Sequence, residues 1–148
     1  MSNKPLNILL ADDDEDDRLF FKEALENIKI KTVVTTVNDG IELMEYLNKS
    51  DIKYPDIVFL DLNMPRKNGI QCLEEIRKDK NLKNLTVAIY STSGSESDIE
   101  ETLIKGANVY IRKPNDFSAL KKVVSETISI NWQFHNSGLN KETFLLSI

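Results

Sequence analysis

The stretch DIVFLDLNMP at residues 56–65 places four consecutive apolar residues directly before Asp61. A strand that is apolar at every position is typical of the middle of a parallel sheet, where helices cover both faces. No helix start lies directly behind Asp61, which argues against a plain helix-capping role for this side chain. The stretch therefore predicts a central parallel strand with a carboxylate at its carboxyl end.

Further pairs of a short apolar run and an amphipathic segment lie on both sides of this strand. The apolar and β-branched runs predict strands at residues 6–11, 32–37, 56–60, 86–90 and 109–112. A helix is expected after each strand; the first covers residues 16–28 with Leu19, Phe20, Ala24 and Ile28 on its apolar stripe, and the last covers 116–128. Strands separated by helices of this length pair in parallel through right-handed crossovers. The sequence thus predicts an α/β fold, a doubly wound five-stranded parallel sheet with helices on both faces.

The bulk composition fits one globular domain. The 148 residues are 41% hydrophobic and carry a formal net charge of −5, with a sequence pI near 5.0. This charge argues against binding to nucleic acid or to an anionic membrane, because both need a basic face. Cys72 is the only cysteine, so no internal disulfide can form. We expect a cytoplasmic domain over residues 1–130 and a tail at 131–148 that packs on it, pairs in a dimer or is disordered.

Polar residues with chemical potential follow four of the predicted strands. Asp12 and Asp13 follow the first strand, Asp61 the third, Ser91 and Thr92 the fourth, and Lys113 the fifth. In an open α/β sheet the carboxyl ends of the strands meet at one rim, where ligands bind. Clustered carboxylates repel one another unless a cation joins them, and Mg²⁺ prefers oxygen ligands. The charge pattern itself predicts a metal site.

The acidic run of residues 12–17 also has plainer interpretations. Asp14 to Asp17 are expected to be solvated or to act as favourable charges at a helix N-terminus. Asp12, Asp14, Asp16 and Glu23 match the carboxylate spacing of a calcium-binding EF-hand loop. That loop needs glycine where Asp17 stands, and a helix rather than a strand before it, so the EF-hand interpretation is disfavoured.

Four motifs occur together in a specific order. They are ILLADD at residues 8–13, VFLDLNMP at 58–65 with Gly69 beyond it, Ser91-Thr92, and YIRKP at 110–114. This ordered set resembles the motifs of response-regulator receiver domains of two-component signalling, and the resemblance spans residues 6–128. It implies the flavodoxin-like receiver fold with strand order 2-1-3-4-5.

The resemblance implies a role for each residue of the rim. Asp61 would accept a phosphoryl group, Lys113 and Ser91 would contact that group, and a cis peptide bond at Lys113-Pro114 would aim the ammonium. The implied metal ion is Mg²⁺, with Mn²⁺ as a substitute; its ligands would be Asp13 directly, Asp12 through water, Asp61, and the backbone carbonyl of Asn63. Ser91 and Tyr110 would form the switch. Residues that would tune the lifetime of the phosphorylated state are Asn63, Arg66, Thr92 and Ser93.

The resemblance implies a phosphorelay regulator. Its partners would be a sensor histidine kinase or phosphotransfer protein and a downstream protein, with a homodimer as a further state. The surface that changes would span residues 97–128, and the only catalysis would be self-phosphorylation and autodephosphorylation. The chain is similar to stand-alone regulators of phytochrome-type kinases in its Asp16-Asp17-Arg18 helix start, in the stretch 48–55, and in a Trp shortly after the last helix.

Three other functions are compatible with parts of this pattern. A flavin-binding electron carrier shares the fold, but its phosphate would meet six acidic residues in the first β-α loop. A haloacid-dehalogenase-type phosphatase needs a second, acid/base aspartate two residues after its nucleophile, where this chain has Asn63. The remaining alternative is a pseudo-receiver, a protein-interaction module that works without phosphorylation; the intact set of Asp12, Asp13, Asp61, Ser91 and Lys113 argues against it.

Overall fold

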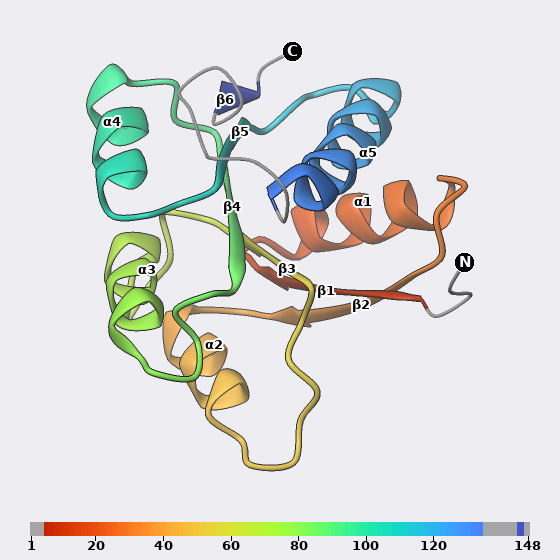
Figure 1. Cartoon of the computed structure of the whole chain (residues 1–148). Coiled ribbons are helices and arrows are strands. Elements are labelled where there is room, and N and C mark those ends of the chain that lie inside the picture. The colour runs from red at the N-terminus through yellow and green to blue at the C-terminus, as the bar shows by residue number, and fades with distance from the viewer. Residues whose placement is uncertain (1–4, 135–144, 147–148) are drawn as a thin grey trace.

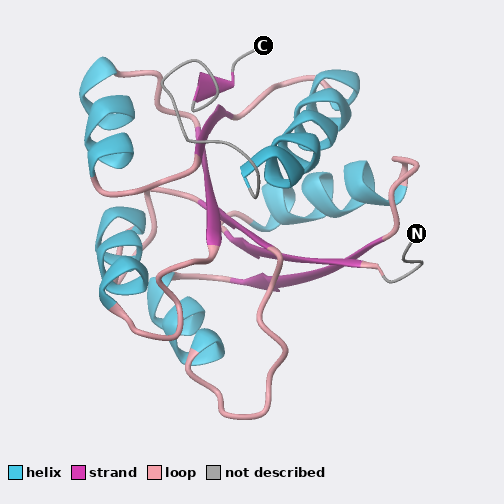
Figure 2. Ribbon diagram, in the orientation of Figure 1, coloured by secondary structure: helices cyan, strands magenta, loops and turns pink. Residues whose placement is uncertain are grey.

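A parallel sheet organises the computed structural model, which describes residues 5–134 and 145–146. Strands and helices alternate (Figures 1 and 2) as β1 Leu6–Ala11, α1 Glu15–Glu26, β2 Thr32–Val37, α2 Gly40–Leu47, β3 Ile57–Leu60, α3 Gly69–Lys78, β4 Thr86–Ser91, α4 Glu96–Ile104, β5 Val109–Arg112, α5 Phe117–Phe134 and β6 Leu145–Leu146. The strand order is β2-β1-β3-β4-β5-β6, and every pairing is parallel. The predicted fold and the order 2-1-3-4-5 are confirmed, with a two-residue sixth strand added beside β5.

The predicted central position of β3 is also confirmed. This strand pairs with β1 on one side and β4 on the other, and all four of its residues are buried. In the pairing register Ala11 lies opposite Leu60, and Leu60 lies opposite Ile89. Because the paired strands end at nearly the same level, the residues that follow them meet at one rim.

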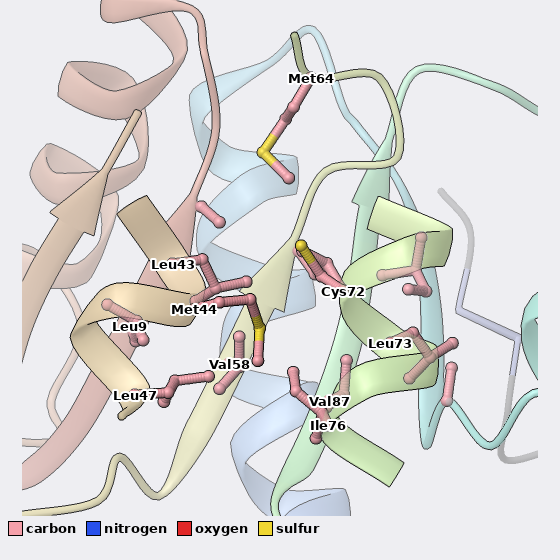
Figure 3. Packing of buried hydrophobic residues seen from close by; sticks show 14 of the residues in the cluster. Leu9, Leu43, Met44, Leu47, Val58, Met64, Cys72, Leu73, Ile76 and Val87 are labelled. Atoms are coloured by element: carbon pink, nitrogen blue, oxygen red, sulfur yellow. The ribbon is translucent and has the colours of Figure 1, made fainter. Parts of the chain in front are cut away.

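Helices cover both faces of the sheet, as Figure 1 shows: α1 and α5 lie on one side, and α2, α3 and α4 on the other. Each face has its own buried cluster. Figure 3 shows the cluster beneath α2 and α3, which includes Leu43 of α2, Cys72 of α3 and Val58 of β3. The cluster beneath α1 and α5 contains Phe21, whose ring packs edge-on against Phe59 with centroids 4.9 Å apart. Burial on both faces makes the sheet a rigid platform for the rim.

Helix-terminal residues behave largely as their chemistry predicts. Asp39 caps α2 by accepting a hydrogen bond from the Glu42 backbone N–H, and Asp116 accepts one from the Ser118 N–H at the start of α5. Gly106 follows the last residues of α4 with φ +101°, the left-handed conformation that glycine adopts at helix ends.

Two predictions about helices are wrong. In the segment predicted as the first helix, Ala24 is buried as predicted, and Phe20 and Ile28 pack partly buried against the core. However, Leu19 is 53% exposed, and the fully buried Phe21 and Leu25 were not in the predicted stripe. Helix α5 does not end near Ile128 but continues to Phe134, and Trp132 therefore lies within the helix rather than after it. Residues 129–134 contain neither glycine nor proline, so nothing in them breaks the helix. The domain boundary at residue 130 and the role of the tail stay predictions, since residues 135–144 and 147–148 lie outside the described residues.

Candidate phosphoacceptor and metal site

The candidate site is formed by the ends of three strands and by the start of one helix that lies close to them. Asp12 follows β1, Asp61 follows β3 and Lys113 follows β5. The Asp61 backbone N–H donates to the carbonyl of Ala11 at 3.0 Å, which ties the two acidic strand ends together. Helix α3 begins at Gly69 directly against this point, and a Cβ at Gly69 would collide with the Asp61 carbonyl. Glycine is thus required where the helix meets the segment that follows β3.

The three predicted carboxylates lie together. Asp12, Asp13 and Asp61 each offer an oxygen within 4.8 Å of the others. Asp12 and Asp61 are 0% and 5% exposed, whereas Asp13 is exposed. Burial raises the pKa of Asp61 to about 6, against a lowering by the Lys113 charge, and burial also raises the pKa of Asp12. Lys113 therefore offsets only part of the negative charge of the site, and a further cation would stabilise it.

Lys113 lies at the centre of these carboxylates. Its ammonium nitrogen is 2.8 Å from Asp12 Oδ2, 2.9 Å from Asp17 Oδ2 and 3.2 Å from Asp61 Oδ2, and its side chain is 8% exposed. Burial alone would lower the pKa of Lys113, but its contacts with the Asp12, Asp61 and Asp17 carboxylates raise it above its ordinary value. The Lys113-Pro114 bond is trans, since residues 5–134 contain no cis peptide bond. The ammonium reaches the site with this trans geometry.

The donor set fits a hard divalent cation. Asp12 Oδ2 is buried and receives no hydrogen bond within the described part of the chain, although the Lys113 ammonium lies 2.8 Å away. A buried carboxylate oxygen without a hydrogen bond is costly unless a cation stabilises it. All three clustered side chains offer carboxylate oxygens, which are the ligands that Mg²⁺ and Mn²⁺ accept.

The predicted switch residues lie one strand away from the metal cluster. Ser91 ends β4, is fully buried, and its Oγ accepts a hydrogen bond from the Ser93 backbone N–H at 3.2 Å. Tyr110 is buried, and its hydroxyl donates to the Ser93 carbonyl at 2.8 Å. Ser93 in turn donates from its hydroxyl to Asp98 of α4 at 2.6 Å. A chain of hydrogen bonds therefore joins the end of β4 to β5 and α4.

The predicted tuning residues are only partly gathered at the rim. The Asn63 backbone N–H donates to Asp61 Oδ1 at 3.2 Å, and Thr92 is exposed beside Ser91. Arg66 has φ +66° and its guanidinium contacts Asp39, the N-cap of α2, at 2.9 Å. The structure thus shows Arg66 bound to a neighbouring helix rather than to Asp61.

The sequence interpretation missed two residues of the site. Asp17, expected to be solvated or a helix-terminal charge, forms an ion pair with Lys113. Arg18 donates from Nη1 to the backbone carbonyl of Asp12 at 2.8 Å and so supports the end of β1. Asp17 lies four residues before the buried Phe21, on the side of α1 that faces the sheet, so helical spacing could have placed it at the site only once the buried stripe of α1 was known.

Comparisons with known proteins agree with this geometry. The model of the response regulator receiver domain family matches residues 8–125. Response regulator Rcp1 of Synechocystis sp. is 31% identical over 127 residues, which cover 83% of this chain and 86% of Rcp1.

Two solved structures share the fold and most of their length with the chain. The phosphorylated cyanobacterial phytochrome response regulator RcpA superposes with a TM-score of 0.77 at 34% identity, covering 93% of this chain and all of RcpA. The Mn²⁺-bound form of response regulator Rcp1 superposes with a TM-score of 0.76 at 28% identity, covering 92% of this chain and 99% of that one. The resemblance to phytochrome response regulators is thus confirmed as a similarity, and the acidic cluster is typical of a receiver metal site.

None of the helices in the described residues is both long and apolar enough to cross a membrane. The family match, the order of the strands and the rim that joins Asp12, Asp13, Asp61 and Lys113 lead to one assignment. The chain belongs to the response regulator receiver domain family.

Proposed function

We propose that this chain is a phospho-accepting response regulator whose phosphoacceptor is Asp61. One observation carries the proposal: the Asp61 carboxylate lies 3.2 Å from the buried Lys113 ammonium and within 4.8 Å of oxygens of Asp12 and Asp13. A carboxylate is a competent nucleophile toward phosphorus when nearby cations offset the charge of the phosphoryl oxygens. The rim provides one such cation and the ligands for another.

The proposed reaction moves one phosphoryl group. An oxygen of the ionised Asp61 attacks the phosphorus of a phosphohistidine on a kinase or phosphotransfer protein. The new O–P bond forms while the N–P bond breaks, and the departing imidazole nitrogen takes a proton from solvent. In dephosphorylation, the oxygen of a water molecule bonds to phosphorus while the Asp61 O–P bond breaks, and the products are the Asp61 carboxylate, inorganic phosphate and a proton released to solvent.

The protein's own residues contribute position and charge to this transfer. The Lys113 ammonium lies close enough to Asp61 to pair with the oxygens of a phosphoryl group there. Its contacts with the surrounding carboxylates keep Lys113 protonated across the physiological range of pH. Asp12, Asp13 and Asp61, with the backbone carbonyl of Asn63, would hold Mg²⁺ or Mn²⁺. When bound, this ion neutralises charge on the transferring group.

The hydrogen bonds around Ser93 support the proposed switch. Phosphorylation of Asp61 would add strong acceptor oxygens at the end of β3, and Ser91 ends the neighbouring strand β4, where its Oγ accepts a hydrogen bond from the Ser93 backbone N–H. If Ser91 turns its hydroxyl toward the phosphoryl group, the Ser93 segment loses that acceptor, and Ser93 also holds Tyr110 and Asp98. The change would reach the surface of α4, β5 and α5, where a downstream protein or a second copy would bind.

The similarity to RcpA and Rcp1 extends the proposal to the upstream partner. A cytoplasmic sensor histidine kinase of the phytochrome type, or a phosphotransfer protein, would donate the group. A pseudo-receiver that signals without phosphorylation is the competing function, and a phosphorylation test with acetyl phosphate distinguishes the two.

The test is incubation with Mg²⁺ and acetyl phosphate, followed by mass spectrometry of the intact protein. The expected result is one added phosphoryl group on the wild type and none on Asp61→Ala. No adduct on the wild type, or an adduct that persists in Asp61→Ala, would support the pseudo-receiver instead.

Asp13→Ala should weaken Mg²⁺ binding by about tenfold or more, because it removes an exposed carboxylate from the cluster while leaving the buried Asp12 and Asp61 in place. Calorimetric titration with MgCl₂ measures the affinity, and Asp16→Ala is the control, since Asp16 is acidic and exposed but outside the cluster. An unchanged affinity in Asp13→Ala would remove Asp13 from the metal site.

A further inference from the structure

Asp17 is a fourth carboxylate at the rim, and it comes from a helix rather than from a strand end. Its Oδ2 accepts a hydrogen bond from Lys113 Nζ at 2.9 Å. Its backbone N–H donates to Asp14 Oδ1 at 3.0 Å, which fixes the first turn of α1. The Asp17 side chain is 39% exposed, whereas that of Lys113 is 8% exposed. Asp17 therefore holds the buried ammonium from the solvent side.

The Lys113 ammonium is already surrounded by carboxylates: it donates hydrogen bonds to Asp17 and Asp61 and forms an ion pair with Asp12. An ammonium group carries three protons, and three carboxylates already lie within 3.2 Å of Nζ. Asp12 and Asp61 belong to the metal cluster, but Asp17 does not. A phosphoryl group on Asp61 would add strong acceptor oxygens next to the same ammonium. One existing contact of Lys113 must then weaken. The contact with Asp17 is the least costly to lose, because the exposed Asp17 carboxylate can bind water in place of the ammonium.

We propose that Asp17 is a tuning residue that competes with the phosphoryl group for Lys113. This inference rests on the proposed phosphorylation of Asp61 and adds a specific electrostatic control to it. While Asp17 is paired with Lys113, it screens part of the ammonium charge from the rest of the rim. Screening favours a divalent cation, which the ammonium repels, and disfavours a phosphoryl group, which the ammonium attracts.

A competing role for Asp17 predicts opposite changes in the affinities for Mg²⁺ and for beryllofluoride, whereas a structural role does not. Asp17→Asn keeps a side chain of the same shape and an oxygen acceptor but removes the charge. We expect Mg²⁺ to bind roughly three- to tenfold more weakly and beryllofluoride, at saturating Mg²⁺, to bind roughly three- to tenfold more tightly. Calorimetry with MgCl₂ and then with beryllofluoride measures both affinities, and urea denaturation checks that the variant is folded.

Asp16→Asn is the matched control. Asp16 lies next to Asp17 in the same turn, is exposed, and has no ion pair in the part of the chain that the structure describes. It removes the same charge from α1 and so measures the general electrostatic effect of the helix terminus. The two affinities should move less in Asp16→Asn than in Asp17→Asn.

Two results would overturn the inference while leaving the proposed function intact. In one, Asp17→Asn matches Asp16→Asn for both ligands, so the contact with Lys113 has no effect. In the other, both affinities fall, so Asp17 orients Lys113 toward the phosphoryl group instead of competing with it. A wild-type chain that binds no beryllofluoride and takes no phosphoryl group would overturn the proposed function, and this inference with it.

Discussion

At the scale of single residues, burial and nearby charge have opposite effects on the pKa of Asp61 at the rim. Burial raises the pKa of Asp61 to about 6, although Lys113 lies 3.2 Å away and partly opposes this shift. An acid whose pKa is raised on folding binds its proton more tightly in the folded state. Its ionised form therefore lowers stability above that pKa, and the stability returns as pH falls from about 6 toward about 4. Keeping Asp61 ionised at neutral pH, as phosphoryl transfer requires, therefore lowers the free energy of unfolding.

Asp61→Asn should stabilise the metal-free protein at pH 8, because the amide needs no ionisation in a buried place and Lys113 keeps Asp12 and Asp17 as partners. We expect the free energy of unfolding to rise by roughly 1–3 kcal/mol at pH 8, and the gain to shrink to about zero near pH 4. Urea denaturation in EDTA at several pH values measures this. Asp16→Asn is the control, and an Asp61→Asn protein less stable than wild type at pH 8 would show that the lost ion pair outweighs the relief of burial.

The residues of the rim differ in how far the sequence could predict them. Asp12, Asp61 and Lys113 directly follow strands, so their meeting follows from parallel pairing alone. Asp17 depends on the rotation of α1, and three consecutive apolar residues, 19–21, allow more than one buried stripe. Only packing against the sheet decides between them, and it buries Phe21 rather than Leu19. Arg66 depends on a left-handed backbone position that no propensity predicts.

At the scale of elements, helix α2 and the β3–α3 loop are locked together beside the site. Asp39 caps α2 through the Glu42 N–H at 2.9 Å and also pairs with Arg66 of the loop. A Cβ at Gly40 would collide with the Lys67 carbonyl, so the helix and the loop are in close contact. The loop carries Asn63, and its position therefore depends in part on Asp39.

Asp39→Ala should lower the free energy of unfolding by roughly 1–2 kcal/mol, because both the cap and the ion pair are lost. Asp39→Asn keeps a good cap and should lose less than about 1 kcal/mol. The Glu42 N–H and then Arg66 lower the pKa of Asp39, so its contribution is present above the ordinary carboxyl pKa and is lost as pH falls below about 4. Urea denaturation at neutral and acid pH measures both variants; equal losses in Ala and Asn would mean that the ion pair, not the cap, is the main contribution.

The helices and strands were predictable where a single sequence pattern, such as an apolar or β-branched run, marks the element. The strand bounds agree to within one residue because each strand is a short apolar or β-branched run. Strands β1, β3, β4 and β5 are largely buried, whereas the edge strand β2 is recognisable from its β-branched residues. The end of α5 was not predictable from the apolar pattern, since residues 129–134 are mixed polar and apolar but contain no helix breaker. Strand β6 has only two residues and forms through pairing with β5, a long-range contact with no local signature.

At the scale of the whole molecule, the chain returns to its own sheet at β6. This strand pairs in parallel with β5, with Leu145 opposite Tyr110 and Leu146 opposite Ile111. Without it β5 would be an edge strand with unpaired backbone groups, and such edges invite pairing between chains. Strand β5 also carries Tyr110, a proposed switch residue, so β6 pairs with a strand of the proposed output surface.

Deleting residues 145–148 should therefore lower the free energy of unfolding by roughly 1–2 kcal/mol, as expected for the loss of a few backbone hydrogen bonds. It should also increase self-association, because β5 becomes an open edge of the sheet. Urea denaturation and light scattering at two protein concentrations measure these effects. A chain that lacks only residues 147–148 keeps β6 and is the control. If the longer deletion matched this control in both stability and mass, β6 would add nothing to the sheet, and the tail would have to act through residues before Leu145.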